Sequence, residues 1–109
     1  MKLEANFAQY DAIFGDEPAS YAEFLEALLR SMEKARTALV AAAEAEDWNV
    51  ISATRHSLKP TLTLLGAHAL NDALDHWRPA MSALDSSPVE QGLTALIQAV
   101  EVKRNGLNA

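Results

Sequence analysis

Hydrophobic side chains recur at helical spacing in five segments of the chain, and the longest of these segments follows Pro18. Its apolar positions alternate spacings of three and four residues, which places them on one face of an α-helix. They are Tyr21, Leu25, Leu28, Met32, Ala35, Leu39 and Ala42. Pro18 suits the first turn of a helix, because the N–H that it lacks has no partner there. The pattern therefore predicts a long amphipathic helix that begins at Pro18 and ends before Asp47.

A shorter amphipathic helix is predicted ahead of Pro18, from Leu3 to Phe14. The sequence GDEP at residues 15–18 ends it, because glycine and proline interrupt helices. We expect this helix to present its apolar side chains to a larger element of the protein: Phe7, Tyr10, Ile13 and Phe14.

A third helix is predicted to begin after Asp47, whose side chain can cap it, and to end near Leu65. Gly66 then suits a helix stop in the left-handed conformation. At about 100° per residue, the apolar side of this helix gathers Ile51, Thr54, Leu58, Thr61, Leu62 and Leu65.

Two further helices complete the pattern. The fourth carries Leu70, Leu74, Trp77, Met81 and Leu84 in register, with a kink expected at Pro79. The fifth opens on SPVE at residues 87–90, which reads as a capping box, and its apolar stripe is Val89, Leu93, Leu96 and Val100, with Ile97 beside it. Short connections between long helices favour antiparallel neighbours. We therefore expect an all-α fold, an antiparallel up-and-down four-helix bundle with a short extra N-terminal helix, formed by residues 1–109 as a single domain.

The composition agrees with this fold and excludes several functions. Half of the residues are hydrophobic but only seven are aromatic (two Trp, two Tyr and three Phe), which favours helix over sheet. Cysteine is absent, so disulfides, thiolate metal sites and cysteine nucleophiles are excluded. The formal charge of −6 argues against a nucleic-acid partner, because phosphate backbones are bound by clustered Lys and Arg. Without a membrane-length apolar run or a signal-peptide core, we expect a cytoplasmic monomer with no membrane partner.

His56 is the side chain whose place on the third helix points to chemistry. On the helical wheel it lies roughly opposite the centre of the apolar side. The residues around it on this outer side are small or compact, except for Lys59: Asn49, Ser52, Ala53, Lys59, Pro60, Thr63 and Ala67. An ordinary solvated face favours long charged residues, whereas a compact face lets another protein approach the imidazole closely. An incidental surface histidine is the competing interpretation.

Pro60 and Lys59 strengthen the functional interpretation of His56. A proline inside a helix is disfavoured by roughly 3 kcal/mol, and this one removes the N–H that would bond the carbonyl of His56. A neutral imidazole is a nucleophile at working pH. The ammonium of Lys59, one turn later, can neutralise an anion delivered to the ring. The residues three and four positions from His56 are Ser52, Ala53, Lys59 and Pro60, and none forms a catalytic dyad with it, so phosphoryl acceptance fits better than hydrolysis.

A metal site is a third possibility. His68, Asp72 and His76 share one face of the fourth helix at spacings of four residues. Two of them can contact one ion from adjacent turns, but all three cannot readily converge. We therefore interpret them as polar residues on a solvated helix face and expect neither a metal nor another cofactor.

The spacing around the histidine also carries a family resemblance. A leucine, a lysine and a glycine follow it after two, three and ten residues: His56, Leu58, Lys59 and Gly66. This pattern resembles the motif of histidine-containing phosphotransfer (HPt) domains of two-component phosphorelays. Residues 10–29 and 43–59 resemble the family's entry into its long second helix and its approach to the histidine, so the resemblance covers nearly the whole chain. Pro60 departs from the motif, which usually has glycine there, and Arg55 replaces a residue that is commonly small.

The resemblance implies a phosphoryl carrier and not a turnover enzyme. His56 would accept a phosphoryl group from the aspartate of a response-regulator receiver domain, or pass one to it, and Lys59 would offset the phosphoryl charge. Ser52, Ala53, Pro60 and Thr63 would form the face on which the partner docks. The implied partners are a receiver domain, a hybrid histidine kinase, or both. The alternative is a non-catalytic helical interaction module that binds a receiver-like surface.

Overall fold

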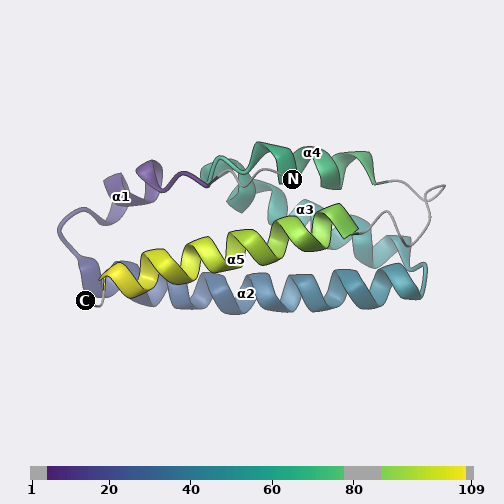
Figure 1. Cartoon of the computed structure of the whole chain (residues 1–109), viewed down its shortest axis with the longest axis horizontal. Coiled ribbons are helices and arrows are strands. Elements are labelled where there is room, and N and C mark those ends of the chain that lie inside the picture. Colours follow the sequence, from purple (N-terminus) through teal and green to yellow (C-terminus); the bar gives the residue numbers. More distant parts are fainter. Residues whose placement is uncertain (1–4, 78–86, 108–109) are drawn as a thin grey trace.

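Five α-helices make up most of the structure in the computed structural model, which describes residues 5–77 and 87–107. They are α1 (Ala8–Phe14), α2 (Pro18–Glu44), α3 (Trp48–Leu64), α4 (His68–His76) and α5 (Ser87–Leu107), arranged as in Figure 1. No strand occurs in these two ranges, so the expected all-α class is confirmed. In this part of the chain, no helix combines the length and the apolarity that crossing a membrane requires.

Helices α2 and α5 form the long axis of the molecule. The 27 residues of α2 span about 40 Å at 1.5 Å per residue, which accounts for most of the 47 Å longest dimension. α5 lies beside α2 along this axis (Figure 1). Near one end Arg104 lies 3.6 Å from Glu26, and further along α2 the Arg36 guanidinium donates to the Thr94 hydroxyl at 3.2 Å. From the first contact to the second, the residue numbers rise along α2 and fall along α5, so the two helices are antiparallel.

The predicted apolar stripes of α2 and α5 meet in the core. All five predicted positions of α5 are buried, and so are Tyr21, Leu25, Met32, Leu39 and Ala42 of α2. Leu28 and Ala35 are only half-buried, whereas Leu29, outside the predicted stripe, is buried. The buried face of α2 is wider than the predicted stripe because α1, α3 and α5 all pack on this helix.

The connection between α2 and α3 combines a left-handed residue with a side-chain cap. Glu46 has φ 54°, and the N–H groups of Glu46 and Asp47 donate to the carbonyls of Ala43 and Ala42, which is the hydrogen-bond pattern of a Schellman motif. The carboxylate of Asp47 then accepts from the N–H of Val50 at 3.3 Å. The predicted N-cap is therefore confirmed.

The end of α3 uses the same motif with glycine. Gly66 has φ 67°, as predicted, and the N–H groups of Gly66 and Ala67 donate to the carbonyls of Thr63 and Leu62. The placement of Ala67 on the outer side around His56 was wrong, because Ala67 is only 2% exposed. The chain leaves the helical path at Gly66, so the helical wheel no longer applies to Ala67.

Helix α1 is shorter than the pattern predicts and attaches to α2 through aromatic rings. It begins at Ala8 after three non-helical residues, because the N–H of Asn6 donates to the carbonyl of Leu65 and its side chain accepts from the N–H of Ala8. The predicted start at Leu3 lies outside the described residues. Tyr10 and Phe14 pack against Phe24, with ring centroids 5.0 and 5.1 Å away. Ile13 was expected to face the protein, but it is 67% exposed.

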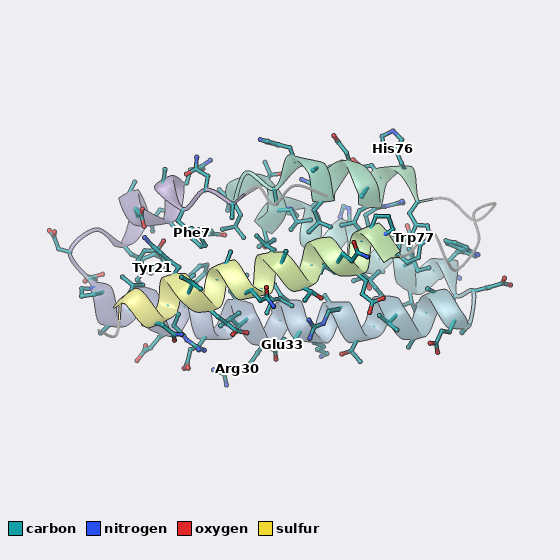
Figure 2. The ribbon with its side chains drawn as sticks, viewed as in Figure 1. Phe7, Tyr21, Arg30, Glu33, His76 and Trp77 are labelled. Carbon is teal, nitrogen blue, oxygen red and sulfur yellow. The ribbon has the colours of Figure 1, made fainter. Side chains whose placement is uncertain are left out.

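Lys103 of α5 connects the last turns of the chain to α1 and the start of α2. Its ammonium lies 3.0 Å from Asp11 and over the rings of Phe7 and Tyr21, both labelled in Figure 2. The Tyr21 hydroxyl donates to Asp11 at 2.9 Å. These hydrogen bonds from Lys103 and Tyr21 lower the pKa of the Asp11 carboxyl, and burial followed by the Asp11 contact raises the pKa of Tyr21.

Helix α4 ends earlier than predicted. The spacing indicated a helix continuing through Trp77, but α4 ends at His76 and Trp77 has extended backbone, with ψ 111°. Helices usually end before a proline, and one follows two residues later. The Trp77 indole, labelled in Figure 2, is buried. It meets Trp48 edge-on, with ring centroids 6.0 Å apart. The other expectations for this region lie outside the described residues: the kink at Pro79, Met81, Leu84 and the capping side chain of Ser87.

The left-handed conformation of Glu46 predicts a stabilising substitution. Glu46→Gly removes the steric cost of a Cβ atom at positive φ, and Glu46 is exposed, so no packing is lost. We expect the free energy of unfolding in urea to rise by about 0.5–1 kcal/mol. Glu23→Gly, at an exposed position inside α2, is the control and should lower it by about 1 kcal/mol. Equal losses in both variants would contradict the assignment.

Candidate functional site

The outer side of α3 is exposed as the helical wheel predicts. Leu58 and Leu62 are 6% and 0% exposed, while His56 faces solvent. We use the name outer α3 face for six exposed residues: Ser52, Ala53, His56, Lys59, Pro60 and Thr63. The expected exposure of His56 and the expected burial of the two leucines are both confirmed.

One border of the outer α3 face is a row of polar contacts with α4. The first is made by Arg55, whose guanidinium donates to the carbonyl of Leu74 at 3.4 Å. The head of Arg55 thus reaches α4, and the residue as a whole is half-buried. Two more contacts follow at steps of one helical turn: Lys59 Nζ to Asp75 Oδ2 at 3.4 Å, and Asn71 Nδ2 to Thr63 Oγ1 at 3.2 Å. We call these three contacts the α3–α4 polar seam.

The other border is an open groove between α3 and α2. It has a volume of about 390 Å³, and its α3 wall includes Ala53 and Ser57. Its α2 wall includes Ser31, Lys34 and Ala38. At 100° per residue around α3, His56 lies between the seam residues, such as Lys59, and the groove residues Ala53 and Ser57. The imidazole is therefore placed between a polar border and an open groove whose lining mixes small residues with Met32, Lys34 and Leu58.

Pro60 lies inside α3 without ending it, since the helix runs from Trp48 to Leu64. Having no N–H, Pro60 leaves the carbonyl of His56 without its usual helical donor. One turn later the Thr63 hydroxyl donates to the carbonyl of Lys59 at 2.8 Å. Threonines inside helices often bond the carbonyl four residues back in this way, as Thr37 does to Glu33 in α2.

The remaining histidines lie on α4, and both are exposed. Figure 2 shows His76 on the outer side of α4, pointing away from the other helices. Its Nδ1 atom lies 2.6 Å from the carbonyl oxygen of Asp72, so this nitrogen donates to the backbone. Within the described ranges, no group of three or more His, Cys, Asp or Glu side chains is arranged to hold a metal ion.

Sequence reasoning missed the partner of Lys59. The sequence placed Lys59 one turn from His56 and named no partner for it, whereas in the structure its ammonium contacts Asp75 on the neighbouring helix. Both side chains stay accessible, at 56% and 39% exposure. The signal that could have found Asp75 is the turn at Gly66, because residues equally distant from a tight turn between antiparallel helices lie opposite each other.

Comparison of the chain with protein-family models, with curated proteins and with solved structures gives no match. The function is therefore argued from the outer α3 face and its two borders. These combine an accessible imidazole, a cation one turn away and compact neighbours.

The position of Pro60 predicts a variant that gains stability. Pro60 is exposed, so Pro60→Ala loses little packing and restores a helical N–H for the carbonyl of His56. We expect the free energy of unfolding to rise by about 2 kcal/mol, after allowing for the greater freedom of the unfolded chain. Ser57→Ala, on the same helix, is the control and should change it by less than about 0.5 kcal/mol. A Pro60→Ala protein that is no more stable than the parent would show that the local backbone accommodates proline without cost.

Proposed function

We propose that this chain is a histidine phosphotransfer protein, in which His56 accepts a phosphoryl group from the aspartyl phosphate of a receiver domain or returns it. The observation that supports this most is the exposed imidazole between the α3–α4 polar seam and the groove beside α2. The HPt-like spacing of His56, Leu58, Lys59 and Gly66 agrees with it.

The transfer needs only the imidazole as nucleophile. The lone pair of Nε2, the more projecting nitrogen, attacks the phosphorus of the aspartyl phosphate. A P–N bond forms while the P–O bond to the aspartate breaks, and the electron pair of that bond leaves with the carboxylate. The ring keeps its proton on Nδ1, so no base has to remove one during the transfer. The reverse step regenerates the neutral ring, and the protein acts as a carrier.

Lys59 would offset the charge that the phosphoryl oxygens bring to this face. It follows His56 by three residues, which puts both side chains on adjoining parts of the helix surface. A charge-assisted N–H···O contact is roughly twice as strong as a neutral one, but an ammonium is a point charge that does not fix geometry. Loss of the lysine should therefore weaken transfer without abolishing it.

The compact side chains of the outer α3 face would serve as the docking surface for the partner. Ser52, Ala53, Pro60 and Thr63 project little, so a receiver domain, alone or as part of a hybrid histidine kinase, can approach the ring. A relay with such partners would place the protein in the cytoplasm.

The finer architecture is part of the same proposal. We infer that α2, α3, α4 and α5 form an antiparallel up-and-down four-helix bundle to which α1 is attached. Two pairs support this arrangement. The residue numbers of successive contacts rise along α2 and fall along α5. They do the same along α3 and α4, where Lys59 meets Asp75 and Thr63 meets Asn71.

His56→Gln tests the proposed acceptor directly. The parent protein and the variant are incubated with receiver domains of the source organism that carry a labelled phosphoryl group. We expect label on the parent and none on the variant. The variant should stay folded, because an exposed polar substitution changes the free energy of unfolding by under about 0.5 kcal/mol. His68→Gln removes another exposed histidine and should keep full labelling. The label should be lost in acid and kept in base, as for a phosphoramidate.

Label that persists on the His56→Gln protein would show that another residue is the acceptor, and His68 and His76 would be tested next. A parent protein that binds a receiver domain but takes up no label would favour the non-catalytic interaction module.

Ala53→Arg tests the docking surface separately from the chemistry. Transfer is measured from the phosphorylated receiver domain to His56. An arginine adds bulk to the outer α3 face, while its cation would favour arrival of a phosphoryl group on the ring, so slower transfer in this direction indicates obstructed docking. We expect the transfer rate to fall at least tenfold, the loss that about 1.4 kcal/mol of docking energy produces. Ala19→Arg is the control, because Ala19 is exposed and lies about 24 Å along α2 from Ala35, which lines the groove with Ala53. Equal rates for the two variants would place the interface elsewhere.

A further inference from the structure

The cation beside His56 is shared with a second helix. Lys59 Nζ lies 3.4 Å from Asp75 Oδ2, and the two side chains are 56% and 39% exposed. On either side of this pair, Arg55 contacts Leu74 and Thr63 contacts Asn71. Burial of Leu70 and Leu74 in the core holds α4 in place, and in this arrangement the Asp75 carboxylate lies within reach of the lysine that flanks the imidazole.

We propose that Asp75 is a positioning residue that acts on the phosphorylated state of His56 through Lys59. The inference rests on the proposed function and adds to it a determinant of how tightly the phosphoryl group is retained. Without a phosphoryl group, Asp75 holds the ammonium on the α4 side of the outer α3 face. When His56 is phosphorylated, the carboxylate and the phosphoryl oxygens compete for the same ammonium.

The exposure of the Lys59–Asp75 pair determines whether the ammonium stays with the carboxylate or moves to the phosphoryl group. Solvent-exposed ion pairs contribute little stability, so the ammonium leaves Asp75 at small cost. A phosphoryl group offers two negative charges and three acceptor oxygens, against one charge and two oxygens on the carboxylate. Lys59 therefore moves toward the phosphoryl group, but the lost contact with Asp75 offsets part of the gain. Asp75 would keep the phosphorylated protein less stable, and so a better donor, than Lys59 alone would make it.

The experiment measures the equilibrium ratio of phosphorylated protein to phosphorylated receiver domain. Asp75→Asn removes the competitor while keeping the shape of the side chain, and we expect this ratio to rise roughly two- to fivefold. Asp72→Asn is the matched control, because it removes the same charge one turn earlier on α4 from an exposed residue. The control should change the ratio by less than about half of the Asp75→Asn effect. Thermal unfolding of both variants should match that of the parent within a few degrees.

A double-mutant cycle separates action through Lys59 from simple charge repulsion. In the Lys59→Ala background the ratio should be lower than in the parent, and Asp75→Asn should now change it by clearly less than in the parent. Equal effects of Asp75→Asn in the two backgrounds would overturn the inference, because Asp75 would then act by its charge alone. An unchanged or lower ratio in the single variant would overturn it as well.

The outcomes also distinguish this inference from the proposed function. Label on His56 with ratios that do not respond to Asp75 would overturn the inference and leave the phosphotransfer function standing. The absence of label on His56 in the parent would overturn both.

Discussion

Burial of the apolar side of α3 is the constraint on which the candidate site depends. Leu58 and Leu62 pack in the core formed with α2, α4 and α5, and a helix of 3.6 residues per turn then has only one orientation. In that orientation His56 must face solvent, because it lies opposite the buried side. The imidazole is exposed by the same packing that stabilises the fold, so no local strain is needed to present it.

The turn at Gly66 adds the second determinant, which is the register between α3 and α4. Lys59 and Asp75 lie eight residues before and after Ala67, and Thr63 and Asn71 lie four residues before and after it. The left-handed glycine thus determines which α4 side chains meet the row beside His56. A change in this turn would move Asp75 relative to Lys59, so the electrostatics of the outer α3 face depend on a backbone conformation several residues away.

The sequence predicted those features that periodicity and local capping control. The burial of Leu58 and Leu62, the cap at Asp47 and the stop at Gly66 each follow from a few neighbouring residues. The errors arise where the chain leaves a helix or where tertiary contacts decide. Ala67 follows a stop and turns inward, Trp77 takes an extended conformation, and the start of α1 is shifted by a bond from Asn6 to the far end of α3. The Lys59–Asp75 contact joins two helices. In the sequence, it is indicated only by the equal distance of the two residues from the turn at Gly66.

The central claim is that the ring of His56 carries the phosphoryl group. The most direct measurement is nuclear magnetic resonance of the ¹⁵N-histidine-labelled protein after transfer from a phosphorylated receiver domain, with detection of coupling between phosphorus and a ring nitrogen. The account predicts one phosphorus signal coupled to Nε2 of His56, with the rings of His68 and His76 unchanged. Coupling to His68 or His76, or a phosphorus signal with no histidine coupling, would contradict it.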